Sequence, residues 1–264
     1  MNKAVLRVKE VLDTHRNAIV IFFTAVFIIL FMFFGKTQEN LELVRHLPIL
    51  RRLPGDYPQY VLYFLLSFFF LGFFPFLAAM LAGKHLPELG LVRPRPLFKH
   101  KITYLVVVAV IVIFGVTNAY NQELYDYYPL SESLIHSIED HGFQYFVLHT
   151  FIYFFMFYMP WALPFRGLLV FPFIYQFCTE KELAAEKWQL NPKIITIALI
   201  QTVPSALLHF GHPVLESLGA IAFGFFMAYV VVKTRSIFWS LVMHAGVGIF
   251  LDLVIILRQL HYLP

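Results

Sequence analysis

Residues 201–250 read QTVPSALLHFGHPVLESLGAIAFGFFMAYVVVKTRSIFWSLVMHAGVGIF. The long apolar runs are broken by a Gly-His-Pro turn and by a short basic turn, a pattern that predicts three successive helices. The runs are continuous instead of alternating polar and apolar residues, so strands are not favoured. Small residues in the middle helix, among them Gly219 and Gly224, allow neighbouring helices to approach closely. We therefore expect the flanking helices to bring His209 and His244 toward one centre.

The composition of the whole chain agrees with this pattern. Of 264 residues, 59% are hydrophobic, 18% aromatic and only 14% charged, and the mean hydropathy is +0.72. A soluble domain of this size needs more polar surface, so the chain is predicted to be a polytopic integral membrane protein. Continuous apolar windows in lipid indicate helices, because helices satisfy their own backbone polar groups. The predicted fold class is an all-α membrane helix bundle with seven or eight transmembrane helices.

The apolar windows also place the spans. The seven clear ones are 17–35, 59–83, 102–117, 143–159, 194–210, 215–232 and 236–257. An eighth segment, 161–178, is bordered or interrupted by Pro160, Pro164 and Pro172. It can cross the membrane, re-enter it, or continue the preceding helix at a kink. No repeat or long linker divides the chain, so we expect one integral membrane domain over residues 1–264.

The charged residues predict the orientation. Lysines and arginines gather in the first 16 residues and again in the 84–101 loop, whereas the 118–142 loop has acids but no lysine or arginine. Basic loops stay in the cytoplasm, so we expect a cytoplasmic N-terminus in a plasma (inner) membrane protein. The net charge of +4 follows from this loop asymmetry. We therefore expect contact with membrane lipids and none with nucleic acid.

Ionisable residues inside the apolar spans are the first candidates for a site, because lipid makes them costly. Arg166, His209 and His244 are the best placed, and His149 and Asp252 are weaker candidates. Two converging imidazoles can bind zinc or another divalent metal, orient a water or stabilise an oxyanion. The alternative is that each histidine only hydrogen-bonds a neighbouring carbonyl group.

The order of three short motifs, FRG, then ALLHFGHP, then KTRSIFWSLVMHA, resembles the CPBP family. That family comprises CAAX prenyl endopeptidases and bacteriocin-processing, abortive-infection-type membrane proteins. The segment LPELGLVRPRP before the third span is also similar to the family's pre-helix loop, so the resemblance covers residues 84–255. It implies the helical core of an intramembrane metalloprotease.

The family's first motif is two adjacent glutamates, three further residues and an arginine. Counting back from Arg166 places the glutamate positions at Trp161 and Ala162, neither of which is acidic. The resemblance implies that Arg166 is a structural arginine that holds the helix end and nearby acceptors. A snorkelling arginine at a helix boundary is the alternative.

The other two motifs are each half present. The second is phenylalanine, three residues and histidine; here Ser205 stands at the phenylalanine position and His209 is kept. The third is histidine, three residues and asparagine or aspartate; His244 is kept and Gly248 stands at the last position. The imidazoles therefore match the family pattern while several of their polar partners do not.

The missing glutamates bear on hydrolysis, because the resemblance implies that a glutamate activates the attacking water. A general base contributes about 10²–10⁴-fold, and tryptophan and alanine cannot act as one. His212 and Glu216 lie four residues apart, but Pro213 leaves their helical pairing open. Asp252 lies two helical turns beyond His244 and about a quarter turn away from it around the helix. A histidine acting alone as base is also possible.

Three hypotheses follow. The first is a catalytically degenerate member of the protease-like family that binds a membrane protein partner, a peptide substrate or a lipid-modified peptide. The second is an active, divergent intramembrane metallo-endopeptidase in which His209 and His244, with His212 or Glu216, hold a metal or a water. The third, a transporter or channel subunit, lacks the paired broken helices of an inverted repeat. An indole packed against both imidazoles favours the first.

Overall fold

The computed structural model describes residues 3–35, 47–48, 50–53, 55–97, 100–179, 182 and 192–264. The chain is 81% helical, and no strand occurs in the described ranges. Within these ranges, six helices are long and apolar enough to cross a membrane, and a shorter apolar helix, Pro192–Leu207, accompanies them. The predicted all-α membrane bundle is therefore confirmed, with a helix number close to the one expected.

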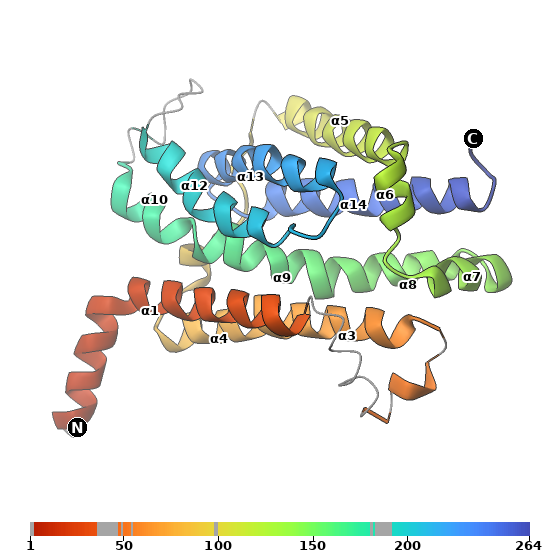
Figure 1. Ribbon diagram of the computed structural model, residues 1–264. Helices are drawn as coiled ribbons and strands as arrows, with labels where there is room; N and C mark the ends of the chain where they lie inside the picture. The colour runs from red at the N-terminus through yellow and green to blue at the C-terminus, as the bar shows by residue number, and fades with distance from the viewer. Residues whose placement is uncertain are drawn as a thin grey trace.

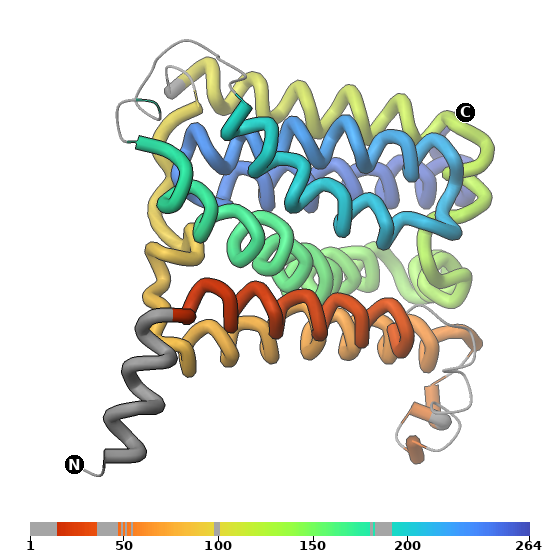
Figure 2. The backbone as a smooth tube through the Cα atoms, turned by 60° about the vertical axis from the view of Figure 1, so that its left-hand side comes forward, coloured from red at the N-terminus to blue at the C-terminus, as the bar shows by residue number. Residues whose placement is uncertain are grey.

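The long helices run alongside one another in layers (Figures 1 and 2). A central rod crosses the middle of the molecule. On one side of it lie α1, α3 and α4, and on the other lie α12, α13 and α14, with α5 outermost. The first side comprises α1 (Lys3–Gly35), α3 (Tyr57–Ser67) and α4 (Phe74–Leu81). The second comprises α5 (His100–Ala119), α12 (Pro192–Leu207), α13 (Val214–Thr234) and α14 (Phe238–Gln259).

The central rod, Gln144–Phe177, contains nearly all of the proline-rich segment 161–178. Its helical pieces follow one another over Gln144–Phe177 and form one span candidate, so the segment continues the preceding helix. The pieces are α8 (Gln144–Tyr153), the π-helix η4 (Phe154–Tyr158), α9 (Met159–Ala162), the π-helix η5 (Leu163–Leu168) and α10 (Phe171–Phe177). Proline removes a backbone donor and crowds the preceding turn. The wider π turns accommodate Pro160 and Pro164 without ending the rod.

The outer surface of the bundle is apolar. Large side chains such as Phe22, Leu105 and Phe210 are 63%, 69% and 71% exposed. Such a surface on a soluble protein would cause aggregation, whereas in lipid it costs nothing. The interior instead holds aromatic side chains packed against one another at tilted angles, including Phe64, Tyr153 and Phe165. The protein is therefore an integral membrane protein.

The expected close approach of helices occurs at one glycine and not at the other. A Cβ on Gly224 would lie 3.1 Å from Thr202 Cγ2, so α13 contacts α12 there. The Gln201 side chain also donates a hydrogen bond to the Gly224 carbonyl at 2.7 Å. Nothing lies within 4 Å of a Cβ built on Gly219, so the prediction of close packing at that residue was wrong.

Two short helices lie between α5 and the central rod: α6 (Gln122–Tyr127) and α7 (Glu132–His141). Asp56, just before α3, joins α7 to the side of the bundle formed by α1, α3 and α4. Its carboxylate accepts hydrogen bonds from Ser131 Oγ at 3.0 Å, Glu132 N at 2.8 Å and Ser133 N at 3.1 Å. Burial by itself raises the pKa of Asp56, but hydrogen bonds from these three residues outweigh burial and hold its pKa below the usual 3.8.

Substituting Asp56 with alanine tests whether its hydrogen bonds to the start of α7 stabilise the fold. A carboxyl with a depressed folded-state pKa stabilises the fold above its unfolded-state value and loses that contribution as the pH falls through its folded-state value. We expect Asp56→Ala to lower the free energy of unfolding by about 1 kcal/mol at pH 7, and the difference from wild type to shrink below a pH of about 3.8. Thermal unfolding in detergent measures this, with Asp140→Ala, an exposed acid, as control. A difference independent of pH would contradict the assignment.

Candidate functional site

Trp161, at the first glutamate position of the family motif, is buried in the bundle on α9. Its indole is 3% exposed. The ring contacts His209 edge to face, with centroids 5.5 Å apart and planes at 74°, and His244 at 6.4 Å and 66°. The two histidines expected to converge therefore both lie against this indole. Ala162, at the second glutamate position, is buried in a neighbouring apolar cluster.

His244, on α14, sits among aromatic rings. Tyr158 lies 5.0 Å from it between ring centroids, and Phe223 lies 6.2 Å away. Arg166 and His209 are the titratable side chains whose charges act on the His244 ring. The ring thus has mostly apolar surroundings with one cation close by.

Gly248 faces Tyr158 across the same region. A Cβ built on Gly248 would collide with the Tyr158 hydroxyl. Tyr158 therefore occupies the space into which an asparagine or aspartate side chain at this position would project. Its ring also packs against that of Tyr153, with centroids 4.5 Å apart.

Arg166, in the π-helix η5, is buried in the bundle. Its side chain is 4% exposed, so it does not snorkel to water. No hydrogen bond or ion pair joins it to any other residue that the structure describes, and Nη1 is buried without a partner. The expectation that Arg166 holds nearby acceptors stays a prediction.

His209 lies in the turn after α12 and is oriented by Ser205. The Ser205 carbonyl lies 2.8 Å from His209 Nδ1, and a carbonyl oxygen can only accept, so Nδ1 carries the proton. In a neutral imidazole the other nitrogen, Nε2, is then an acceptor. The Ser217 hydroxyl also donates to the His209 carbonyl at 2.8 Å, which fixes the turn between α12 and α13.

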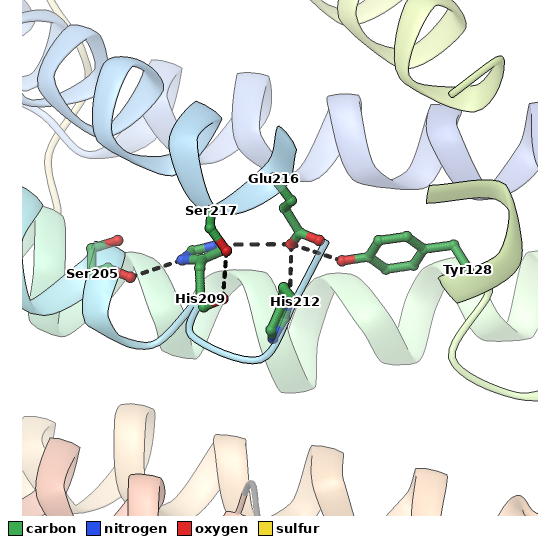
Figure 3. Close-up of polar contacts among 6 residues, drawn as sticks. All are labelled: Tyr128, Ser205, His209, His212, Glu216 and Ser217. Carbon is green, nitrogen blue, oxygen red and sulfur yellow. Dashed lines mark hydrogen bonds and ion pairs between the residues drawn. The ribbon is translucent and has the colours of Figure 1, made fainter. Parts of the chain in front are cut away.

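A second group of polar side chains surrounds Glu216, in the first turn of α13 (Figure 3). Tyr128 donates its hydroxyl proton to Glu216 Oε1 at 2.9 Å, and His212 Nδ1 lies 3.0 Å from the same oxygen. His209 Nε2 lies 3.9 Å from it. We call Tyr128, His209, His212 and Glu216 the Glu216 cluster. It is partly open to the surroundings, since the Glu216 side chain is 20% exposed.

The pairing of His212 with Glu216 was left open by the sequence because Pro213 lies between them. The helix resolves this by beginning at Val214, so Pro213 is its N-cap and causes no break. A carboxylate in the first turn is also favourable for the helix dipole. Tyr128 was missed, because it lies 88 residues from Glu216 in the chain and no local pattern links the two.

The Glu216 cluster places two proton acceptors opposite each other. His209 Nε2 and Glu216 Oε1 are 3.9 Å apart, too far for a direct hydrogen bond. One hydroxyl group or water between them would be within hydrogen-bond distance of both. The arrangement is able to take a proton from such a group.

A zinc site, one of the alternatives that the two histidines left open, is not formed by the residues that the structure describes. Among them, no three His, Cys, Asp or Glu side chains are arranged to hold a metal ion. His209 and His244 both face the Trp161 indole. The donor set therefore does not fit a divalent metal.

His149 and Asp252 form a separate polar group with Tyr60. His149 Nε2 lies 3.0 Å from Asp252 Oδ2, and the Tyr60 hydroxyl is hydrogen-bonded to His149 Nδ1. The His149 and Asp252 side chains are almost fully buried. This chain of three links α3, α8 and α14 in the interior, so Asp252 pairs with His149 and not with the two motif histidines.

Comparison with known families supports the resemblance inferred from the motifs. Residues 163–250 match the family model described as type II CAAX prenyl endopeptidase Rce1-like. The match includes Arg166, His209 and His244 and begins just after Trp161 and Ala162. Searches of curated proteins and of solved structures found no match. The resemblance is thus confirmed over a segment narrower than the one expected.

Proposed function

We propose, for a membrane protein that is Rce1-like over residues 163–250, that it binds a lipid-modified or membrane-spanning peptide without hydrolysing it. The observation that carries this proposal is the Trp161 indole in contact with both His209 and His244. Hydrolysis needs a water and a base beside these imidazoles. A tryptophan ring excludes the water and cannot accept its proton. The family match suggests a peptide ligand. The Trp161 indole is the reason to expect that the peptide is bound without being hydrolysed.

The surroundings of the Glu216 cluster support a partner that arrives through the lipid. Phe210, Val214 and Leu218, next to His209 and Glu216 in the chain, are each more than 60% exposed. An apolar prenyl chain or a transmembrane segment would bury this surface. The polar groups of the same peptide would then lie within reach of His209 and Glu216.

The proposed location is the plasma (inner) membrane with the N-terminus in the cytoplasm. It rests on the basic residues of the first 16 positions and of the 84–101 loop, and on the acidic 118–142 loop.

One observation favours a second function, a divergent hydrolase. Glu216 brings a carboxylate within 3.9 Å of His209 Nε2, so a base is present beside one of the two motif histidines. In this alternative Glu216 and His209 together deprotonate a water that attacks the peptide bond. The proton passes to the departing amine. Glu216 would then replace the missing glutamate pair from another helix.

A single peptide assay separates the two functions. A farnesylated peptide is incubated with the purified protein in lipid nanodiscs, and products are measured by mass spectrometry. We expect no cleavage above that of His209→Ala. Cleavage that falls by about 10²-fold or more in Glu216→Gln, but not in the exposed control Glu132→Gln, would establish the second function instead.

Binding is measured on the same peptide. A photoactivatable residue at Phe210 should crosslink to it, whereas the same residue at Phe22, exposed on α1 beyond the central rod, should not. Equal crosslinking from both positions would indicate nonspecific partitioning into lipid and would contradict specific binding.

A further inference from the structure

Two segments that are far apart in the chain lie side by side at one end of the bundle. The first, residues 90–97, precedes α5, and the second, residues 233–239, joins α13 to α14. Three hydrogen bonds hold them together: Ile237 N to the Gly90 carbonyl at 3.1 Å, Ser236 Oγ to the Val92 carbonyl at 2.7 Å, and Arg95 N to the Thr234 carbonyl at 2.9 Å. The two segments therefore run in opposite directions beside each other.

This pairing brings four basic residues together. Arg93 and Arg95 lie on the first segment, Lys233 and Arg235 lie on the second, and neither segment contains an aspartate or a glutamate. Arg93 and Arg95 are exposed, and neither forms an ion pair with a carboxylate that the structure describes. Like charges held close together repel one another unless an anion lies between them.

The carboxylates Glu88 and Glu182, near these segments, each have a lysine partner. Glu88 Oε1 lies 3.1 Å from Lys84 Nζ, and Glu182 Oε1 lies 2.7 Å from Lys193 Nζ. Each acid is thus matched by a positive charge of its own. The four basic residues of the paired segments, which we call the basic corner, keep an excess of positive charge.

The backbone of the basic corner also favours an anion. The 22-residue helix α14 begins at Phe238, directly after Arg235 and Ser236, and the start of a helix carries a partial positive charge. Arg235 itself has a φ of 54°, in the left-handed region that residues other than glycine and asparagine rarely adopt. An arginine kept in such a conformation indicates that its side chain has a role there.

The basic corner lies at the level of lipid headgroups. The spans Lys101–Ala119 and Phe238–Gln259 begin beside it, and the span Val214–Thr234 ends in it. Exposed apolar side chains follow directly on the membrane side, Phe238 on α14 and Tyr104 on α5. Tyr104 packs edge to face against Trp239, with ring centroids 5.4 Å apart, as is typical of aromatic residues at a membrane boundary. A ligand here meets positive charge at one end and apolar surface at the other.

We propose that the basic corner binds an anionic phospholipid, with its phosphate between the two paired segments and its acyl chains against Phe238 and Tyr104. The guanidinium fork of arginine matches the oxygens of a phosphate group. A zwitterionic lipid is disfavoured because its own ammonium group would lie among the basic side chains. The site is separate from the Glu216 cluster, since Glu216 and Lys233 lie 17 residues apart on α13, about 26 Å along the helix axis.

The first test needs no substitution. The full-length protein in detergent is titrated separately with phosphatidylglycerol and with phosphatidylcholine of the same acyl chains, and the bound lipid is counted by native mass spectrometry. Because each basic residue near the headgroup adds a factor of about five, we expect phosphatidylglycerol to bind at least about tenfold more tightly. Equal binding of the two lipids would overturn the proposal.

Variants locate the bound lipid. The double substitution Arg93→Gln, Arg95→Gln should weaken phosphatidylglycerol binding by about tenfold or more and leave phosphatidylcholine binding unchanged. Arg235→Asn should weaken it by about fivefold, and asparagine tolerates the left-handed backbone at this position. The matched control is Arg52→Gln, which removes an exposed arginine before α3, at the opposite end of the bundle. An equal loss in this control would show that only the net charge matters and would overturn the site.

A soluble anion provides the last distinction. Inorganic phosphate in large excess, at an ionic strength matched with sodium chloride, should not displace phosphatidylglycerol, because it has no acyl chains to contact Phe238 and Tyr104. Displacement by phosphate but not by chloride would identify a site for free phosphate and overturn the lipid assignment. Binding of the farnesylated peptide should be unchanged in Arg93→Gln, Arg95→Gln, and its loss there would show that the basic corner is not a separate lipid site.

Discussion

Substituting Asp252 with alanine is expected to lower the free energy of unfolding by about 3 kcal/mol or more. The reason is that His149 would lose its partner at 3.0 Å while remaining buried between α3, α8 and α14. A buried polar group left without its partner costs more than the pair contributes when intact. Thermal unfolding in detergent, or resistance to guanidinium, measures the change.

Two further variants sharpen this prediction. The double substitution His149→Phe, Asp252→Leu removes both polar groups and should recover much of the lost stability. Asp140→Ala, on the exposed end of α7, should change stability little. An Asp252→Ala variant as stable as the Asp140→Ala control would show that the His149 pair contributes nothing to the fold.

Substituting Gly248 with alanine is expected to lower the free energy of unfolding by about 1–3 kcal/mol, because the new methyl group would collide with the Tyr158 hydroxyl. Gly219→Ala is the matched control, since nothing lies within 4 Å of a Cβ there. A glycine-to-alanine change in an open helix position should stabilise the helix by about 0.5–1 kcal/mol. The two variants should therefore differ in sign.

The collision partner gives a second check. Tyr158→Phe removes the nearest clashing atom, so the double variant Gly248→Ala, Tyr158→Phe should recover part of the stability lost in Gly248→Ala, although the ring remains close. If the single variant unfolds at the same temperature as Gly219→Ala, Tyr158 does not occupy the space beside Gly248. Thermal unfolding of all four proteins in the same detergent decides this.

Local patterns were sufficient to predict the helices and to suggest the contact between His212 and Glu216. Continuous apolar windows placed the spans, since lipid allows few alternatives to a helix. The four-residue spacing of His212 and Glu216 suggested that they pair. They do so because α13 begins after Pro213 and the proline does not interrupt it. Motif order alone identified the Rce1-like segment, which the family match confirms for residues 163–250.

Contacts between distant segments could not be predicted in the same way. Tyr128 reaches Glu216 from 88 residues away, and Tyr60 and Asp252 reach His149 from 89 and 103 residues away. Such pairs depend on how the helices are rotated against one another, which local periodicity does not determine. The packing of Trp161 against two histidines is of the same kind. The orientation in the membrane stays a prediction.

The π turns make the helix faces sensitive to small changes in chain length. Three of them interrupt the spans, at Phe68–Phe73, Phe154–Tyr158 and Leu163–Leu168. Each adds one residue to an otherwise α-helical turn, and one residue corresponds to a rotation of about 100°. Deleting one of the residues between Trp161 and Arg166 would therefore rotate Trp161 by about 100° relative to Arg166. An insertion or deletion of one residue in this turn can therefore change the contact of Trp161 with His209 and His244 without substituting any of these side chains.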